Sequence, residues 1–291
     1  GPGAQPEPLT PDVDLRYADG VIDRPRGRMV CVREDHTVSG REAVNTLVSL
    51  DLERGGVGEV LASGNDFYSS PRLSPDGSRM AWLTWNHPNM PWDGTEVWIG
   101  ELASDGSLGQ HQRIAGGCDE SIFQPEWSPD GLLYFVSDRT GWWNLYRWRD
   151  GQVETLLEME AEFGVPQWAF GTSTYGFASA QRIICAYNQQ GTWHIVNLYT
   201  ESGKLETIPT PFTEITRSGM QVSPEHVVFG AGSPSMPDSL MHHDLSTGQT
   251  KTLRRSSDVT IDVGYLTSPQ SIEFPTERGL TAHAFFYPPK N

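Results

Sequence analysis

The chain has 291 residues, enough for one large domain with a buried core, and its 30 glycines and 21 prolines favour many turns over long helices. Its formal net charge of −16 would repel a phosphate backbone or an anionic bilayer, so we expect neither nucleic acid nor membrane as a partner. The three cysteines, Cys31, Cys118 and Cys185, are too widely spaced for a zinc motif, and we expect three buried, reduced thiols in a cytoplasmic protein without metal or cofactor.

A unit of about 50 residues recurs along the chain. Its most regular feature is a turn written "SPDG" or a variant of it, which starts at Asp23, Ser74, Ser128 and Ser223. We place a further copy in "VPQWAFG", where Trp168 takes the position that Trp127 has in "QPEWSPDG". The repeat predicts five copies of one structural module.

Each unit has the pattern of four short strands separated by turns, as in "RMAWLTW", "TEVWIGEL" and "HQRIAG" of the second copy. The proline of the shared turn presets φ and the glycine supplies the permissive position, so this turn is predicted to join the first two strands. One four-stranded sheet cannot cover both of its faces, whereas sheets stacked around an axis cover one another. We therefore predict an all-β protein, a β-propeller of four-stranded antiparallel blades, with a two-sheet sandwich as the alternative; the blades are placed at residues 16–64, 65–117, 118–159, 160–211 and 212–258.

Three phrases are more distinctive than a blade requires. They are "RYADGVIDRPRGRMVCVREDHT" at residues 16–37, "LTWNHPNMPWDGTEVWIGEL" at residues 83–102 and "ESIFQPEWSPDGLLYFVSDRTGWWNLYRW" at residues 120–148. Together they resemble the propeller of bacterial serine peptidases of the prolyl oligopeptidase family, on the acylaminoacyl-peptidase and dipeptidyl-aminopeptidase side. The resemblance covers essentially the whole chain and implies a seven-bladed propeller, of which five blades are visible here.

The two ends of the chain are expected to lie outside the blades. Residues 1–15 have the composition of a linker, or are the remnant of a preceding blade, and not of a signal peptide. Residues 265–291, with "FPTERGLTAHAFFYPPKN", resemble the lead-in to the α/β-hydrolase domain of that family. The sequence contains no G-x-S-x-G nucleophile motif, since "GTSTYG" at residues 171–176 has the wrong spacing. We expect no catalytic residue in this chain and no hydrolysis of peptides by the chain itself.

The resemblance implies a non-catalytic propeller that gates and docks short peptide substrates for a hydrolase domain of the same parent protein. In that parent a Ser-His-Asp triad would carry out acyl transfer. The alternative is a stand-alone TolB-like propeller that acts as a protein-interaction scaffold. A propeller glycosidase or lectin would need paired carboxylates, and no convincing pair is visible. A G-x-S-x-G motif in the reading frame beyond Asn291 would favour the peptidase, and a stop codon would favour the scaffold.

The phrase "VREDHT" supplies the first candidates for substrate contact, Arg33, Glu34 and His36, at the end of a predicted strand. A glutamate on a propeller can pair with the free amine of a peptide through charge-assisted hydrogen bonds. The alternative is an ordinary salt bridge, either solvated or between blades.

The phrase "WNHPNMPWDGTE" supplies Trp85, His87 and Trp92 in a long proline-bearing loop between two strands. Such a loop on one face of a propeller is a natural recognition site, and its aromatic side chains could line a pocket for an apolar side chain. The alternative is a loop that packs against its own blade, with Trp92 as its anchor.

The phrase "SDRTGWWNLY" supplies Arg139 and Trp142 as the remaining candidates for substrate contact. Arg139 could bind a substrate carboxylate or carbonyl through two nitrogens, although an Asp-Arg pair before a glycine turn favours a structural role. His242 and His243 are adjacent, so on a strand their side chains would diverge and not share a metal ion. A ring that lacks two blades would also expose apolar blade faces, and we expect these to drive oligomerisation or closure of a smaller ring.

Overall fold

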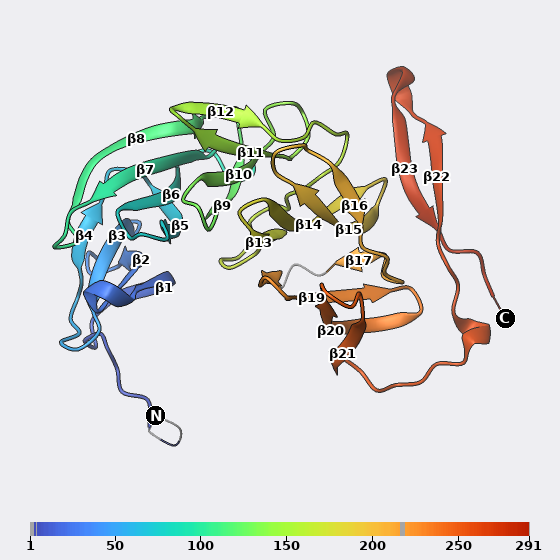
Figure 1. The fold of residues 1–291 in the computed structure, drawn as a ribbon, viewed down its shortest axis with the longest axis horizontal. Helices are drawn as coiled ribbons and strands as arrows, with labels where there is room; N and C mark the ends of the chain where they lie inside the picture. The colour runs from blue at the N-terminus through green and yellow to red at the C-terminus, as the bar shows by residue number, and fades with distance from the viewer. Residues whose placement is uncertain (1–2, 4, 216–218, 291) are drawn as a thin grey trace. The chain divides into compact units, whose positions relative to one another are not determined.

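The computed structural model describes residues 3, 5–215 and 219–290, and the chain divides into two compact units (Figure 1). The first unit comprises Gly1–Gly141, Leu145–Thr155 and Pro166–Gly171. The second comprises Trp142–Asn144, Leu156–Val165 and Thr172–Asn291. Each unit consists of antiparallel sheets that run as meanders, so each is described by its sheets.

The first unit holds three four-stranded sheets, in each of which successive strands are neighbours. Blade 1 contains β1 (Leu15–Asp23), β2 (Arg28–Asp35), β3 (Val44–Asp51) and β4 (Glu59–Ala62). Blade 2 contains β5 (Phe67–Leu73), β6 (Arg79–Trp85), β7 (Glu96–Leu102) and β8 (Leu108–Gly116). Blade 3 contains β9 (Ile122–Trp127), β10 (Leu133–Ser137), β11 (Asn144–Arg149) and β12 (Gln152–Thr155).

The second unit holds two further sheets and a hairpin. Blade 4 contains β13 (Tyr175–Ser179), β14 (Arg182–Gln189), β15 (Thr192–Tyr199) and β16 (Leu205–Thr207). Blade 5 contains β17 (Glu214–Ile215), β18 (Gln221–Val222), β19 (His226–Ser233), β20 (Met236–Asp244) and β21 (Thr250–Arg255). The hairpin contains β22 (Gln270–Pro275) and β23 (Thr281–Phe286). Helical structure within the described residues is confined to 3₁₀ turns at Arg24–Arg26, Val263–Tyr265 and Glu277–Gly279, so the predicted all-β class is confirmed.

The shared turn joins the first two strands of a blade, as the sequence predicts. The Ser74 hydroxyl donates to Asp76 Oδ1 at 2.6 Å and accepts the backbone N–H of Arg79 at 2.9 Å. Ser128 repeats this arrangement with Asp130 at 2.5 Å and Leu132 at 3.0 Å. The serine therefore closes the turn, and the glycine that follows takes a positive φ (+69° at Gly77), which other residues avoid.

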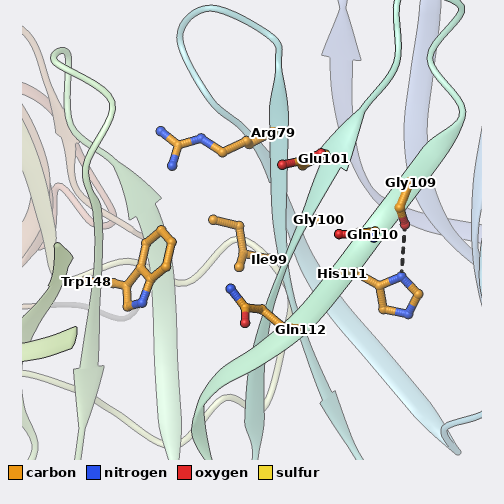
Figure 2. A pocket seen from close by; sticks show the side chains of 9 residues that line it. All are labelled: Arg79, Ile99, Gly100, Glu101, Gly109, Gln110, His111, Gln112 and Trp148. Carbon is orange, nitrogen blue, oxygen red and sulfur yellow. Dashed lines mark hydrogen bonds between the residues drawn. The ribbon is translucent and has the colours of Figure 1, made fainter. Parts of the chain in front are cut away.

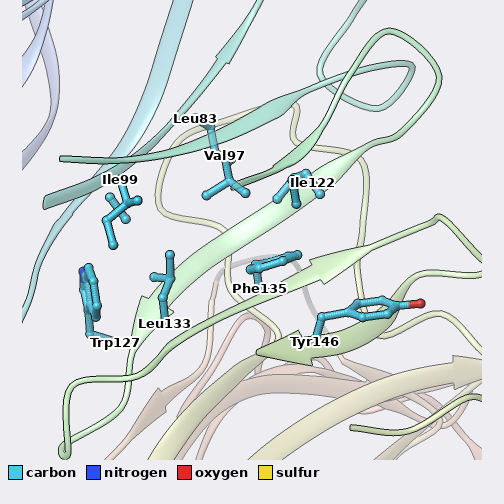
Figure 3. Close-up of a cluster of buried hydrophobic side chains, with 10 residues drawn as sticks. Leu83, Val97, Ile99, Ile122, Trp127, Leu133, Phe135 and Tyr146 are labelled. Carbon is cyan, nitrogen blue, oxygen red and sulfur yellow. The ribbon is translucent and has the colours of Figure 1, made fainter. Parts of the chain in front are cut away.

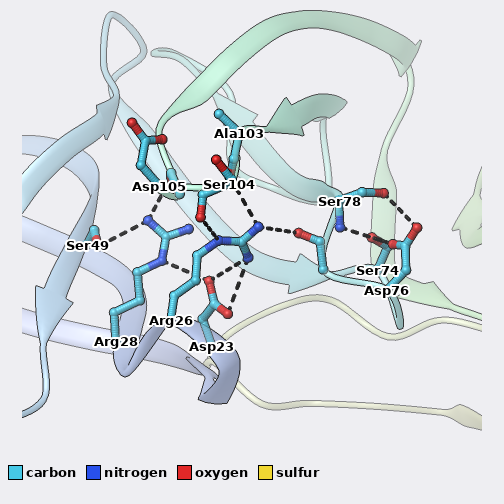
Figure 4. Close-up of polar contacts among 12 residues, drawn as sticks. Asp23, Arg26, Arg28, Ser49, Ser74, Asp76, Ser78, Ala103, Ser104 and Asp105 are labelled. Carbon is cyan, nitrogen blue, oxygen red and sulfur yellow. Dashed lines mark hydrogen bonds and ion pairs between the residues drawn. The ribbon is translucent and has the colours of Figure 1, made fainter.

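Arginines connect the turns that start at Ser74 and Ser128 to the preceding blade, and Figure 4 shows the first of these junctions. Arg26 Nη2 of blade 1 donates to the carbonyl of Gly77 in blade 2 at 3.1 Å. Arg79 Nη2 of blade 2 donates to the carbonyl of Gly131 in blade 3 at 2.8 Å. The same glycine carbonyl thus accepts an arginine at both junctions. The repeat of the turn follows from two needs, a tight strand connection and a docking point for the neighbouring blade.

Blades 2 and 3 meet through a cluster of buried apolar side chains (Figure 3). Its members come from the facing sides of both sheets and include Leu83, Val97, Ile99, Ile122, Trp127, Leu133, Phe135 and Tyr146. Each such side chain stabilises the fold by roughly 1.5–3 kcal/mol relative to an exposed position. The Trp127 indole of blade 3 also donates to the carbonyl of Arg72 at 3.0 Å, so the polar edge of this ring has a partner in blade 2.

The predicted equivalence of Trp168 with Trp127 is wrong, although the strands of blade 4 lie within the predicted residues 160–211. Trp168 is 67 % exposed and lies outside the sheets, in the segment Pro166–Gly171 of the first unit. The first strand of blade 4 begins only at Tyr175, and its turn is the tight connection between Ser179 and Arg182. Trp168 follows a proline by two residues, as Trp127 does at the end of β9, but Trp168 does not pair with a neighbouring strand.

Candidate functional site

The topology places the predicted residues of the first unit at one end of its blades. In a meander, the loop after the second strand and the connection to the next blade lie at the same end of the sheet. We call this end the loop end. It comprises residues 36–43, 63–66, 86–95 and 117–121. The shared turns and the connections after the third strands lie at the opposite end, which we call the turn end. Arg33, Glu34, His36, Trp85, His87, Trp92 and Arg139 all lie near the end of a second strand or in the loop that follows it.

Of the three candidates of blade 1, Glu34 and His36 contact each other, whereas Arg33 contacts the backbone. The His36 ring nitrogen Nε2 lies 3.1 Å from Glu34 Oε2, with both side chains partly exposed. Arg33 Nη1 donates instead to the carbonyl of Val57 at 3.1 Å, in the connection between β3 and β4. Glu34 and His36 therefore remain accessible for a ligand, whereas the contact of Arg33 supports the structural interpretation.

His87 and Trp85 meet at the ring of Phe67. Phe67 stacks on Trp85 with centroids 5.3 Å apart, and its centroid lies 4.9 Å from that of His87. The backbone N–H of His87 donates to Asp66 Oδ2 at 2.9 Å, and its ring Nδ1 lies 3.1 Å from the same oxygen. These two hydrogen bonds lower the pKa of Asp66. Beside them lies a small cavity of about 180 Å³ lined by Trp85, Asn86, His87, Pro88, Asn89, Gly94, Glu96, Gly117 and Cys118.

Trp92 forms a ring pair that the sequence does not predict. Its centroid lies 4.2 Å from that of Trp168, with 41° between the ring planes. The loop that carries Trp92 is fixed by Asp93, whose Oδ2 accepts the N–H of Met90 at 2.9 Å. The segment that carries Trp168 is fixed by Gln167 Nε2, which donates to Ser69 Oγ at 3.1 Å. Trp92 therefore does not simply pack against its own blade.

The Arg139 guanidinium contacts two neighbouring side chains, Glu120 and Tyr146. Its Nη2 and Nε donate to Glu120 Oε1 at 2.7 and 3.0 Å, and its guanidinium lies 5.0 Å from the centroid of the Tyr146 ring. The Ser137 hydroxyl donates to the same carboxylate oxygen at 2.6 Å. These contacts support the structural role of Arg139. Trp142 belongs to the second unit and is 40 % exposed.

The first strands of blades 1–3 contain the same backbone irregularity, a β-bulge, at the same position. Asp19, Ser70 and Gln124, at the same place in β1, β5 and β9, have φ values of 52°, 54° and 47°. Each lies where the pairing with the second strand shifts register, which marks a β-bulge. Left-handed backbone at a non-glycine residue is energetically unfavourable and persists only where neighbours fix it. The Asp19 carboxylate accepts the N–H of Ser70 and so ties one bulge to the next.

A polar network joins these strands two residues further on. Arg72 Nη1 lies 3.9 Å from Asp19 Oδ1, and Arg72 Nε lies 3.4 Å from Glu126 Oε2. Burial raises the pKa of Glu126, and the charge of Arg72 opposes that shift. One guanidinium thus serves two carboxylates from neighbouring blades. The sequence signal was available, because Arg72 and Glu126 are 54 residues apart, the spacing of the repeat.

A larger cavity lies between blades 2 and 3 toward the turn end (Figure 2). Its volume is about 650 Å³, and Trp148 and Ile99 form its apolar part. Arg79 and Glu101 stand at one side, whereas the His111 ring turns toward the carbonyl of Gly109 at 3.2 Å. None of the eight predicted contact residues, all of which the structure describes, lines this cavity.

Two solved structures match almost the whole chain. Puromycin hydrolase is 34 % identical to it, with a TM-score of 0.90 over 99 % of this chain and 45 % of that one. A Mycobacterium tuberculosis puromycin-hydrolyzing peptidase is 31 % identical, with a TM-score of 0.90 over 99 % of this chain and 46 % of that one. Over 99 % of its length, the chain thus matches the propeller region of a peptidase of the prolyl oligopeptidase family. It spans less than half the length of these two relatives.

The propeller fold extends to more distant structures. Prolyl oligopeptidase B from Galerina marginata, at 11 % identity, matches 94 % of this propeller and 38 % of its own chain with a TM-score of 0.71, which shows a common fold alone. No family model and no curated protein matches the sequence. The family resemblance and the propeller class are therefore confirmed, whereas the roles of the eight contact residues and the count of seven blades stay predictions.

One expectation about the cysteines is wrong. Cys31 and Cys185 are buried, and burial raises the pKa of the Cys31 thiol to about 11. Cys118 is exposed, because it lies in the connection between β8 and β9, where its sulfur is 3.5 Å from Asp119 Oδ2. The described part of the propeller holds no group of three or more His, Cys, Asp or Glu side chains that could bind a metal ion. None of its described helices is long and apolar enough to cross a membrane.

Proposed function

We propose that this chain is the gating and docking propeller of a serine peptidase that acts on short peptides. Its similarity to two puromycin-hydrolysing peptidases over 99 % of its length carries the proposal. The partner would be an α/β-hydrolase domain of the same parent protein, which would supply the Ser-His-Asp triad for acyl transfer. The propeller would exclude folded proteins and admit short peptides, including aminoacyl amides such as puromycin.

The stiff junctions between blades support a gating role. The arginine contacts to Gly77 and Gly131 and the network through Arg72 connect blades 1–3 at their turns and along their first strands. Blades that are connected both at their turns and along their first strands can exclude large substrates without a closing motion. The loop end, by contrast, presents partly exposed polar and aromatic side chains, among them Glu34, His36 and His87, which suit contact with a peptide.

The sequence lacks a G-x-S-x-G nucleophile motif, which supports the proposal that this chain binds peptides and another domain hydrolyses them. We expect the chain alone to bind puromycin and short peptides without hydrolysing them. The measurement is calorimetric titration followed by chromatography of the incubated mixture. Hydrolysis by the purified chain would contradict the proposal, because the nucleophile would then lie within these residues.

The reading frame beyond Asn291 distinguishes the peptidase from the alternative scaffold. We expect it to continue into a G-x-S-x-G motif, and the product to hydrolyse a tripeptide amide while leaving a folded protein of similar sequence intact. A stop codon directly after Asn291, together with no affinity for peptides, would contradict the peptidase and favour a TolB-like interaction propeller.

A further inference from the structure

We infer that Met90, Trp92, Trp168 and Phe170 form a binding surface for the aromatic side chain of a short peptide; we call this surface the aromatic platform. The inference rests on the proposed function and names the substrate class that the loop end would select. It adds Trp168 and Phe170, which lie outside the repeated strands, to the residues that determine specificity.

The first observation is the exposure of these side chains. Trp168 is 67 % exposed, Phe170 46 % and Met90 46 %, whereas Trp82 and Trp127 in the blades are only 2 % and 6 % exposed. Scattered single apolar residues on a surface need no explanation, but large apolar side chains gathered on one loop and one segment that contact each other mark an interaction site. The platform therefore has apolar area that a ligand can cover.

The second observation is that both supports of the platform are anchored. Gln167, next to Trp168, donates to the hydroxyl of Ser69, a fully buried residue of β5. On the other side, Asn89 Nδ2 donates to the carbonyl of Cys118 at 2.8 Å and Asp93 accepts the N–H of Met90. Anchored aromatic rings lose little conformational entropy when a ligand binds, which favours affinity.

The two rings of the pair are not parallel. The planes of Trp92 and Trp168 make an angle of 41°, so the two indoles do not cover each other as a parallel stack would. Aromatic rings prefer offset or edge-to-face contacts at centroid distances of about 4.5–7 Å, and each such contact adds about 0.5–1.5 kcal/mol to area burial. An aromatic side chain therefore gains more on this surface than an aliphatic one.

The size and charge of the platform favour a peptide side chain over other occupants. A stable protein dimer buries at least about 1,200 Å² in total, more than four side chains provide. An anionic membrane surface would be repelled by the net charge of −16 and by Asp93 and Asp119 in the adjoining loops. A single aromatic residue of a short peptide needs less apolar area than a dimer and, unlike an anionic membrane, is not repelled by these charges.

The test is a calorimetric titration of the full chain with Phe-Gly-Gly and with Ala-Gly-Gly. We expect Phe-Gly-Gly to bind about tenfold more tightly. Trp168→Ala should remove this preference and leave the affinity for Ala-Gly-Gly unchanged, and Trp168→Phe should retain most of it. Tyr265→Ala is the control, because Tyr265 is also an exposed aromatic residue (73 %) but lies outside the platform and is not among the predicted contact residues.

The outcomes separate this inference from the proposed function. Equal affinity for the two peptides, or a preference that survives in Trp168→Ala, would overturn the platform and leave peptide binding intact. A loss of affinity for both peptides in Trp168→Ala, with an unchanged circular dichroism spectrum, would assign Trp168 to general binding and also overturn aromatic selectivity. No binding of either peptide to the unmodified chain would overturn the proposed function together with the platform.

Discussion

The two ends of the blades in the first unit are built from different chemistry. At the turn end, charged side chains are buried and paired: Asp23 is 2 % exposed and accepts hydrogen bonds from Arg26 and Arg28 (Figure 4). At the loop end, the contact of His87 with Asp66 is about half exposed, and the Trp168 ring, which contacts Trp92 of the β6–β7 loop, is largely in solvent. The turn end thus uses its polar groups to hold blades together, whereas the loop end leaves its side chains available.

This difference teaches where to look for function in a repeated fold. The features that recur with the repeat, such as the serine turn and the arginine that contacts its glycine, serve the junctions between blades. The β6–β7 loop with Trp92 and the segment with Trp168 occur only once, and their exposed rings contact each other in addition to the hydrogen bonds that anchor them. Single occurrences are therefore the better candidates for ligand contact.

The largest expected effect comes from Asp23→Ala at the turn end. It removes the carboxylate that pairs with Arg28 Nε at 2.8 Å and Arg26 Nη1 at 3.1 Å and leaves both guanidiniums poorly compensated. We expect the free energy of unfolding to fall by about 3–5 kcal/mol, measured by urea denaturation. Asp14→Ala is the control, since its contact with Arg16 is exposed and 4.0 Å long, and should change stability by less than about 1 kcal/mol. Equal effects of the two variants would contradict the structural role of the turn end.

A smaller effect is expected for Ser74→Ala. The variant loses the hydroxyl that closes the turn and leaves the N–H of Arg79 without that acceptor, so we expect a loss of about 1–3 kcal/mol. Ser223→Ala tests the turn of blade 5, where the hydroxyl accepts the N–H of His226 but no aspartate follows, and should cost less. Thermal unfolding of both variants provides the measurement. A larger loss of stability in Ser223→Ala than in Ser74→Ala would show that Asp76 does not contribute to the stability of its turn.

The same turn should respond to acid. The hydroxyl of Ser74 and the N–H of Ser78 lower the pKa of Asp76 from 3.8 to about 2. Because the folded pKa lies below the unfolded one, the stability that this carboxylate adds is present above about pH 4 and is lost as the pH falls toward 2. The stability difference between the unmodified chain and Asp76→Asn should therefore shrink between pH 5 and pH 2.5. A difference that stays constant over this range would contradict the assignment.

The smallest effect is expected at a loop. Trp142→Ala removes a ring that is 40 % exposed, and we expect the free energy of unfolding to change by no more than about 0.5 kcal/mol. Guanidinium denaturation measures this difference. A fall in the free energy of unfolding of more than about 1.5 kcal/mol would show that this loop stabilises the fold as much as a shared turn does. That result would contradict the difference drawn between the two ends of the blades.

The sequence predicts the fold well because its signals are local. A serine, a proline and a glycine in one turn fix the connection of two strands, and short alternating runs fix the strands themselves. Trp168 was aligned wrongly with Trp127 because both follow a proline by two residues, and only the packing shows that the two indoles have different surroundings. A recognition site in the β6–β7 loop was predicted from the aromatic and histidine residues of one sequence phrase, which contains Trp85, His87 and Trp92.

The partners of the candidate residues could not be predicted, because they come from distant segments. Asp66, which binds His87, lies 21 residues away, and Gln167, which anchors Trp168, lies 98 residues from Ser69. The contact of Arg33 with the carbonyl of Val57 also depends on how the connection after β3 folds back over the sheet. Such contacts follow from tertiary structure and leave no local pattern.

The most direct test of the account is a map of peptide contacts by nuclear magnetic resonance of the whole chain. Addition of Phe-Gly-Gly should shift the indole N–H signals of Trp92 and Trp168 and the amide signals of the β6–β7 loop. The amide signals of the turns at Asp76 and Asp130 should stay in place. Shifts confined to these turns, with unchanged signals at the two indoles, would contradict the assignment of binding to the loop end and of stability to the turn end.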